Sequence, residues 1–285
     1  MSIDKLMEER LLEFLKEDLG FEDITTNALV PEKTTARARI ICKGEGVIAG
    51  VQEACVIFRL LNIEFKPLVR DGDRVRKGQT VMELSGSARA ILSAERTVLN
   101  IMMRMSGIAT ETSKLVEATK KVNPKIRIAC TRKTTPGFRY FEKKAVALGG
   151  GDTHRFRLDD MILIKDNHLS IIGGVREAVK QARLKTSFSK KIEVEVENAE
   201  QALEAALAGA DIIMFDNMPP EEAKKTLELL EERGLREKVL IELSGGITPE
   251  NIKKYSALNV DIISMGYITH SARALDLSLD FEKES

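Results

Sequence analysis

The chain has 285 residues, of which 43% are hydrophobic and 31% are charged. This composition is typical of a globular protein with one large or two ordinary domains, and it excludes a disordered or fibrous chain. Lysine plus arginine number 44, as do aspartate plus glutamate, so the net charge is near zero. We therefore expect no broadly basic nucleic-acid-binding surface, and any anion site must be a local cluster.

Targeting and redox signals point to the cytoplasm. The first twenty residues alternate charged and apolar side chains, which is not the pattern of a signal peptide. No apolar run approaches the roughly 18 residues of a membrane span. The cysteines, Cys42, Cys55 and Cys130, are odd in number and widely spaced, so they form neither a disulfide framework nor a metal-binding pair.

The first part of the chain mixes helices with short strands. Apolar residues at helical spacing predict a helix over 5–19, which ends at Gly20. Residues 36–87 read as short strands and glycine turns around one helix at 52–62. A long helix is predicted over 93–122, opening with Ser93. We place a domain boundary near residues 105–120.

The second part of the chain alternates β-like runs with amphipathic helical segments. This alternation predicts parallel βαβ units. No GxGxxG motif follows the first run, which favours a barrel over a dinucleotide-binding fold. The six runs are 126–130, 161–164, 192–196, 211–215, 238–243 and 260–264.

Polar residues or glycines stand at the carboxyl end of all six runs. In a parallel barrel these ends meet at one mouth, where active sites lie, so we expect the residues to share one site. They are Thr131, Arg132 and Lys133 after the first run, Lys165 after the second, Glu195 in the third, Asp216 after the fourth, Ser244, Gly245 and Gly246 after the fifth, and Gly266 after the sixth.

The third run, IEVEVEN, places three carboxylates on one face of a strand. Glu193, Glu195 and Glu197 alternate with apolar residues, which should contact the outer helices. The glutamates would then lie inside the barrel or at its mouth, where ionised carboxylates need cations or a metal. A solvated amphipathic strand is the alternative interpretation.

The expected mouth is rich in cations. Arg132, Lys133, Arg155 and Lys165 would gather there with His154 beside them, and such groups suit carboxylates and phosphates. Two acids at adjacent strand ends, Glu195 and Asp216, are a donor set for Mg²⁺. The glycines of SGGIT and MGYIT would let backbone N–H groups approach a phosphate.

Other interpretations of these residues stay open. Arg132 or Arg155 could pair with a barrel glutamate, and His154 could be an ordinary loop histidine. Lys165 could form a Schiff base with a carbonyl substrate. Residues 69–86 are similar to a biotinyl- or lipoyl-type hairpin, which would suggest a carrier module, but no lysine stands in the short motif that a carrier needs at its tip.

Seven motifs in fixed order give the chain a family resemblance. Residues 130–168, CTRKTTPGFRYFEKKAVALGGGDTHRFRLDDMILIKDNH, are followed by EVEVEN, FDN, SGGI and DIISMG, while FEDITT and AERT stand earlier in the chain. Together these resemble the quinolinate phosphoribosyltransferases, also called carboxylating nicotinate-nucleotide pyrophosphorylases. The resemblance covers nearly the whole chain.

The resemblance implies an α/β fold of two domains. An N-terminal α/β sandwich would span residues 1–112, and the tail 272–285 would pack on it. An incomplete parallel α/β barrel of six or seven strands would span residues 113–271. The family also implies a homodimer or a multiple of dimers, with no nucleic-acid or membrane partner.

The implied reaction belongs to de novo NAD synthesis. Quinolinate and phosphoribosyl pyrophosphate, with Mg²⁺ as cofactor, would give nicotinate mononucleotide, pyrophosphate and carbon dioxide. Nicotinate phosphoribosyltransferase and a molybdenum-associated paralogue remain as alternatives. A monocarboxylate such as nicotinate would need fewer cations than this chain offers.

The resemblance also implies roles for individual residues. Lys133, Lys165, Glu195 and Asp216 would be catalytic, the two acids also holding Mg²⁺, largely through water or substrate. Arg96 would come from the partner subunit. The pyridine dicarboxylate would contact Thr131, Arg132, Lys133, His154, Arg155 and Lys165, and the phosphate groups would contact Ser244, Gly245, Gly246 and Gly266.

Overall fold

The computed structural model describes residues 3–282, which divide into two compact units. The first unit contains the residues up to Glu111, Ala147–Gly149, and the residues from Ala272 onward. The second unit contains Thr112–Val146 and Gly150–Ser271. The C-terminal segment therefore belongs to the same unit as the N-terminal part of the chain.

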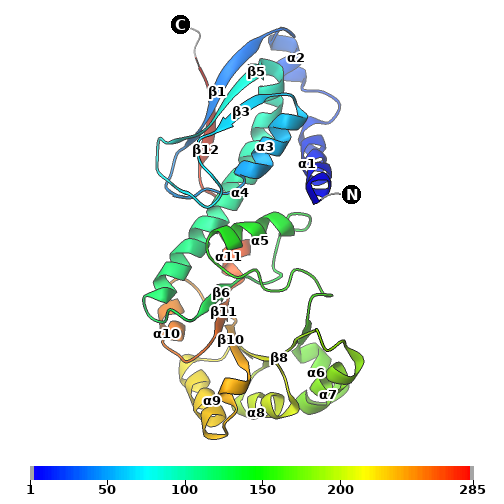
Figure 1. Ribbon diagram of the computed structural model, residues 1–285, viewed down its shortest axis with the longest axis vertical. Coiled ribbons are helices and arrows are strands. Elements are labelled where there is room, and N and C mark those ends of the chain that lie inside the picture. The colour runs from blue at the N-terminus through cyan, green and yellow to red at the C-terminus, as the bar shows by residue number, and fades with distance from the viewer. Residues whose placement is uncertain (1–2, 283–285) are drawn as a thin grey trace. The chain divides into compact units, whose positions relative to one another are not determined.

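The first unit is built on a four-stranded antiparallel sheet with the order β12-β1-β5-β3. Figure 1 shows these strands side by side, with α3 running along them. Ala38, Ile40 and Cys42 alternate along β1 as buried residues, so one face of the sheet carries the core. The strands are β1 (Thr35–Cys42), β3 (Glu64–Pro67), β5 (Thr80–Ser87) and β12 (Leu277–Phe281), beside a small pair, β2 (Gly46–Val47) and β4 (Arg74–Val75).

The helices of this unit are α1 (Ile3–Leu19), α2 (Ile24–Leu29), α3 (Val51–Leu60) and the start of the long helix α4 (Ala88–Lys120). The predicted start of α4 at Ser93 was wrong by five residues, because β5 leads directly into the helix. The Oγ atom of Ser87 accepts a hydrogen bond from the Ala90 N–H at 3.4 Å, in the manner of a helix cap. Ser93 instead donates its hydroxyl hydrogen bond to Asp23 at 3.2 Å.

A close crossing fixes the C-terminal segment on α4. The N–H of Leu275 donates to the carbonyl of Met103 at 3.0 Å. A Cβ atom at Gly107 would lie 2.2 Å from the carbonyl oxygen of Arg273, so only glycine allows the two backbones to approach this closely. The segment then continues into β12, where Leu279 is opposite Ile40 of β1.

The second unit contains six parallel strands in the order β6-β11-β10-β9-β8-β7. The predicted fold class, α/β with an incomplete parallel barrel of six or seven strands and an N-terminal α/β sandwich, is confirmed by this six-stranded parallel sheet and the antiparallel sheet of the first unit. Beyond β6, a single parallel bridge joins Ala129 to Asp152, so one further residue extends the sheet. The strands are β6 (Arg127–Ala129), β7 (Ile162–Ile164), β8 (Ile192–Val196), β9 (Ile212–Asp216), β10 (Leu240–Ser244) and β11 (Ile262–Ser264).

Helices join these strands in the expected alternation. Gly209 in the left-handed region (φ 87°) ends α8, and Pro220 starts α9. Only Ile164 of β7 is buried, because β7 is an edge strand of the sheet. The helices are α5 (Arg139–Leu148), α6 (Asp166–Ile172), α7 (Val175–Lys185), α8 (Ala199–Ala208), α9 (Pro220–Glu232), α10 (Ile252–Ser256) and α11 (Tyr267–His270), with a short 3₁₀ helix, η1 (Arg236–Lys238).

Within residues 3–282, no helix combines the length and the apolar character needed to cross a membrane.

Candidate active site

A cavity of about 540 Å³ lies at the carboxyl ends of the parallel strands. All of its lining residues belong to the second unit. The structure therefore brings together most of the predicted site residues, namely Thr131, Arg132, Lys133, His154, Arg155, Lys165, Glu195, Asp216, Ser244, Gly245 and Gly246. Asn217, which follows Asp216 in the strand-end motif FDN, also lines it, as do residues that the sequence analysis did not place in the site: Cys130, Leu163, Met214, Glu242 and Ser264.

Two predicted residues lie outside this lining. Gly266 is close to it, since a Cβ atom added there would lie 3.0 Å from Cδ of Lys133. Arg96 lies on α4 in the first unit, with a side chain that is 61% exposed. Its nearest acidic group is the carboxylate of Glu95 at 3.9 Å.

The two arginines of the cavity make no ion pair with any described residue. Arg155 is only 9% exposed and donates from Nη1 to the carbonyl of Met161 at 3.4 Å. Burial lowers the pKa of the Arg155 guanidinium, and the nearby charge of Arg132 lowers it further. The Nε atom of Arg132 is buried without a hydrogen-bond partner. Two neighbouring guanidinium groups in this state favour an anionic ligand.

The acids Glu195 and Asp216 come from neighbouring strands. Glu195 of β8 is opposite Met214 of β9, and Asp216 follows two residues later, so both side chains lie on the same face of the sheet. Glu195 accepts a hydrogen bond from Lys165 Nζ at 2.7 Å, and Asp216 accepts one from the Asn217 side-chain amide at 2.8 Å. Two carboxylates beside an open cavity fit Mg²⁺, which prefers oxygen ligands and retains several waters.

The turn after β10 is suited to a phosphate group. Gly245 and Gly246 are both in the left-handed region, with φ values of 85° and 61°. A Cβ atom at Gly245 would lie 2.3 Å from Oδ1 of Asn217, so the close approach also requires glycine. The Asn217 N–H donates to the Ser244 carbonyl at 2.9 Å, which ties this turn to the end of β9.

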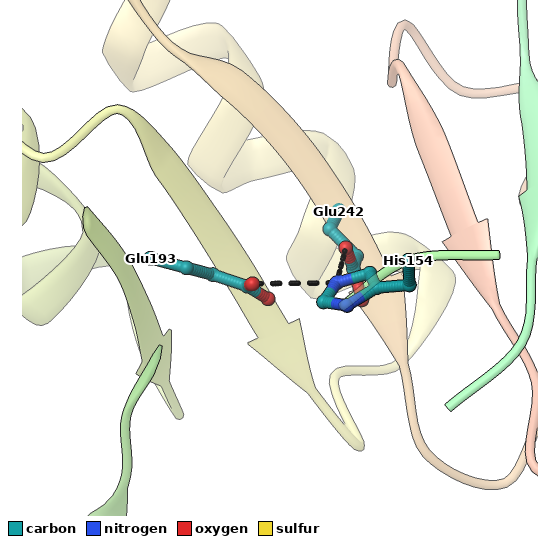
Figure 2. A group of neighbouring side chains, drawn as sticks. All are labelled: His154, Glu193 and Glu242. Carbon is teal, nitrogen blue, oxygen red and sulfur yellow. Dashed lines mark hydrogen bonds and ion pairs between the residues drawn. The ribbon is translucent and has the colours of Figure 1, made fainter. Parts of the chain in front are cut away.

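The floor of the cavity contains a buried group of one histidine and two glutamates. Figure 2 shows the ring of His154 between the carboxylates of Glu193 and Glu242. The His154 Nε2 atom lies 3.2 Å from an oxygen of Glu242 and 3.3 Å from an oxygen of Glu193. Both glutamates are completely buried, and three of their four oxygens have no hydrogen-bond partner.

The glutamate face predicted for β8 is only partly correct. Glu193 is buried and Glu195 lines the cavity, whereas Glu197 is exposed because it lies beyond the end of the strand. The sequence analysis missed Glu242, although the same signal is present in β10. Glu242 alternates there with the buried residues Ile241 and Leu243.

This buried group retains an extra proton. Burial by itself would lower the pKa of His154, but the close carboxylate of Glu193, the hydrogen bond to Glu242 and the charges of both raise it to about 10. Burial also raises the pKa of Glu193. The Nδ1 atom of His154 accepts a hydrogen bond from the Arg155 N–H at 2.8 Å, so the proton on the ring is at Nε2. The further proton is then carried by a carboxylate, in line with the raised pKa of Glu193.

The chain belongs to a class of α/β proteins in which a parallel sheet carries a cavity lined by arginine, lysine and acidic side chains at its carboxyl edge. Two family models match it: "Quinolinate phosphoribosyl transferase, N-terminal domain" over residues 23–106 and "Quinolinate phosphoribosyl transferase, C-terminal domain" over residues 108–280. Because these models cover most of the sequence, the chain belongs to the quinolinate phosphoribosyltransferase family, as the motifs predicted.

Curated relatives and solved structures agree with this assignment. A probable nicotinate-nucleotide pyrophosphorylase (carboxylating) of Methanothermobacter thermautotrophicus is 52% identical over 96% of this chain and 98% of the relative. The human nicotinate-nucleotide pyrophosphorylase (carboxylating) is 39% identical over 90% of this chain and 86% of its own. The crystal structure of NadC from Streptococcus pyogenes superposes with a TM-score of 0.90, at 39% identity and 99% coverage of both chains.

The carrier-module interpretation of residues 69–86 is wrong. This segment contains β4 and most of β5, and the N-terminal family model covers it. β4 pairs with β2 and β5 pairs with β1 and β3, so the two strands do not form a hairpin with each other, and the segment belongs to the N-terminal part of a transferase family.

The proton held by the buried group predicts a pH-dependent stability. The folded group keeps its proton up to about pH 10, whereas an unfolded histidine loses it near 6.5, its ordinary pKa. The folded state thus binds more protons in this interval, and the free energy of unfolding should fall as the pH rises through it. Glu193→Gln removes one buried carboxylate, so this fall should be smaller in the variant.

Urea unfolding of the two proteins across this interval measures the difference. Comparing wild type with Glu193→Gln at each pH cancels the groups that titrate in both. Equal slopes in the two proteins would show that the buried group holds no extra proton.

Proposed function

We propose that this protein transfers the phosphoribosyl group of phosphoribosyl pyrophosphate to quinolinate, with loss of carbon dioxide. The products would be nicotinate mononucleotide and pyrophosphate, in de novo NAD synthesis. The observation that carries the proposal is the pair Arg132 and Arg155, which line the cavity without a carboxylate partner among residues 3–282. The names of the relatives support the same reaction.

The charge arrangement supports an orientation for the substrates. A pyridine dicarboxylate would lie against Arg132 and Arg155, near His154 and Lys165, with Thr131 and Lys133 at the side of the ring. Arginine's planar fork binds a carboxylate through two parallel hydrogen bonds. The phosphate groups would lie at the turn of Ser244, Gly245 and Gly246, with Gly266 nearby.

The residues of the cavity would act mainly by positioning and by charge. The pyridine nitrogen is a poor nucleophile, so holding it close to C1 of the ribose must supply much of the rate. The N–C1 bond forms as the C1–O bond to pyrophosphate breaks, and Lys133 and Lys165 would neutralise the departing charge. Glu195 would face the ribose, whose centre gains positive charge in the transition state.

Loss of carbon dioxide follows from the product of the first step. Once the ring nitrogen is alkylated, the cationic ring accepts the electron pair of the breaking bond to the 2-carboxylate, and a proton then replaces that carboxylate. Glu195 and Asp216 would hold Mg²⁺, largely through water and the substrate's oxygens. When bound, this ion supplies positive charge next to the pyrophosphate.

A cytoplasmic location is part of the proposal. The three cysteines are free thiols, and Cys42 and Cys130 are buried. Free thiols are typical of a reducing compartment.

The reaction predicts a clear substrate preference. Purified protein, given phosphoribosyl pyrophosphate and Mg²⁺, should release carbon dioxide from quinolinate and should convert nicotinate far more slowly. The reason is that nicotinate lacks the second carboxylate that the unpaired guanidinium groups favour. Trapping of labelled carbon dioxide and chromatography of the mononucleotide measure both reactions. Faster conversion of nicotinate, without carbon dioxide, would reject the proposal.

The two acids predict a separate effect on turnover. Glu195→Gln and Asp216→Asn should each lower kcat and raise the Mg²⁺ concentration needed for half-maximal rate. Quinolinate binding to the free enzyme, measured by calorimetry, should be largely retained, because the cations remain. Glu197→Gln, an exposed glutamate next to the same strand, is the matched control. Normal activity of either variant at limiting Mg²⁺ would show that the substituted acid has only a structural role.

We also infer a homodimer, or a multiple of dimers, in which Arg96 serves the partner's cavity. The support is the family resemblance together with the exposed guanidinium of Arg96, which makes only a 3.9 Å contact with Glu95. A twofold dimer would then contain two equivalent composite sites.

Subunit mixing tests this arrangement. Arg96→Ala and Arg155→Ala homodimers should each be nearly inactive. In a mixed dimer one site carries both substitutions and the other carries neither. Random exchange makes about half of the dimers mixed, so about a quarter of wild-type activity should be restored. No recovery, with mixed dimers verified by native mass spectrometry, would mean that Arg96 acts within its own chain or not at all.

A further inference from the structure

The segment that carries His154 and Arg155 has an unusual backbone. Both side chains line the cavity although they are consecutive in the sequence. In extended chain, consecutive side chains point to opposite faces. Asp152 is extended and pairs with β6, so the chain must turn sharply after it. His154 makes this turn in the left-handed region, at φ 50°.

A left-handed conformation at a residue other than glycine is strained and persists only where the surroundings hold it. Two local bonds contribute here. The His154 N–H donates to a carboxylate oxygen of Asp152 at 2.8 Å, and the Arg155 N–H donates to Nδ1 of His154 at 2.8 Å. The second bond also couples the orientation of the imidazole ring to the backbone of Arg155.

Lys143 of α5 holds the turn from one side. Its side chain is completely buried, and its ammonium group donates to the carbonyls of Thr153 and Arg155, the latter at 2.9 Å. The Sγ atom of Cys130 lies 3.5 Å from the same nitrogen and donates to the Thr153 carbonyl at 3.3 Å. All three ammonium donors are thus used, two of them on the backbone that flanks His154.

Glu242 holds the turn through the imidazole ring. It lies on the floor of the cavity, completely buried, with one carboxylate oxygen 3.2 Å from Nε2 of His154. Since Nδ1 of the same ring accepts the Arg155 N–H, the ring is fixed at both nitrogens. Glu242 and Lys143 are therefore buried ionisable side chains that fix the ring and the carbonyls of the turn, and Glu193 lies on the other side of the ring at 3.3 Å.

We propose that Lys143 and Glu242 are positioning residues for substrate recognition, which hold the Thr153–Arg155 turn so that His154 and Arg155 both face the ligand's carboxylate. The proposal rests on the proposed function, because it names residues behind the carboxylate-binding side of that site. Neither residue needs to touch the substrate. A fixed turn avoids ordering the two side chains at the moment of binding.

A metal ion is the competing explanation for the buried group. The ligand atoms of His154, Glu193 and Glu242 lie within 4.8 Å of one another. A metal ligand at Nε2 would require the ring proton to be on Nδ1, where it would oppose the Arg155 N–H. The observed acceptor at Nδ1 therefore favours a hydrogen-bonded group over a metal site.

The test compares Glu242→Leu, Glu242→Gln and Lys143→Met in the full-length protein. Glu242→Leu and Lys143→Met should raise KM for quinolinate by about ten- to a hundredfold, the scale expected for a misplaced binding group. KM for phosphoribosyl pyrophosphate should change little. Glu242→Gln should remain close to wild type, because its amide oxygen can still accept the Nε2 hydrogen bond. Lys144→Met, the next residue on α5, is the matched control.

Several outcomes would overturn the inference. Equal increases in both KM values would indicate a general loss of structure. An unchanged quinolinate KM in Glu242→Leu would show that Glu242 does not position His154 and Arg155. A loss of kcat in Glu242→Gln at unchanged KM would make Glu242 a proton donor. Stoichiometric metal in purified wild type that is lost in Glu242→Gln would restore the metal explanation.

Two further controls keep the result interpretable. If Lys143→Met does not fold, as judged by thermal melting, Glu242→Leu and Glu242→Gln carry the comparison alone. Carbon dioxide release by the wild type is measured in the same assay. If the wild type releases no carbon dioxide from quinolinate, the proposed function is rejected. If the wild type is active and Glu242→Leu has an unchanged quinolinate KM, only the positioning role is rejected.

Discussion

Parallel pairing of six strands in one sheet is the constraint on which the site depends. In a parallel sheet every strand ends at the same edge, so residues far apart in sequence meet without any special contact between their loops. Glu195, Asp216 and Ser244 illustrate the effect, since the pairing of β8 with β9 and of β9 with β10 fixes their relative positions along the strands. Because side chains alternate, the same register decides which of them face the cavity and which contact the helices.

The charges of the cavity fall into two groups with different physical roles. Lys165 pairs with Glu195, and His154 is enclosed by Glu193 and Glu242, so these two basic side chains have acidic partners within the protein. Arg132 and Arg155 form no ion pair among the described residues, and the charges of Glu193 and Asp160 act on Arg155 only from beyond ion-pair distance. Burying a charge without a partner is costly, and an anionic ligand would supply the missing partner. An anionic ligand would thus balance the positive charge of the two guanidinium groups that form no ion pair within the protein.

Backbone geometry supplies the rest of the specificity. The left-handed conformations of His154, Asn217, Gly245 and Gly246 all occur at the cavity. Such conformations are tolerated where surrounding bonds hold them, and they direct side chains or N–H groups that regular structure could not direct. The buried side chains of Lys143 and Glu242 provide these bonds at His154.

The sequence by itself predicted six strands that alternate with helices, and the residues that stand at the carboxyl ends of those strands. Alternation in IEVEV and the polar residues after each apolar run are local patterns, and the strand-end rule converts them into a common site. Family motifs then supplied the reaction. The start of α4 was missed because the hydroxyl that caps it, Ser87, belongs to the preceding strand, while Ser93 offered an equally plausible cap.

Only the tertiary structure decided which groups compensate one another. The contact between His154 and Glu242 joins residues 88 positions apart, and no local pattern specifies such a pair. The left-handed turn at His154 and the complete burial of Lys143 likewise depend on the packing of α5 against the segment after Asp152. Periodicity reports which face of an element is buried, whereas the partner across the core is fixed by three-dimensional packing and by the need to satisfy each buried charge.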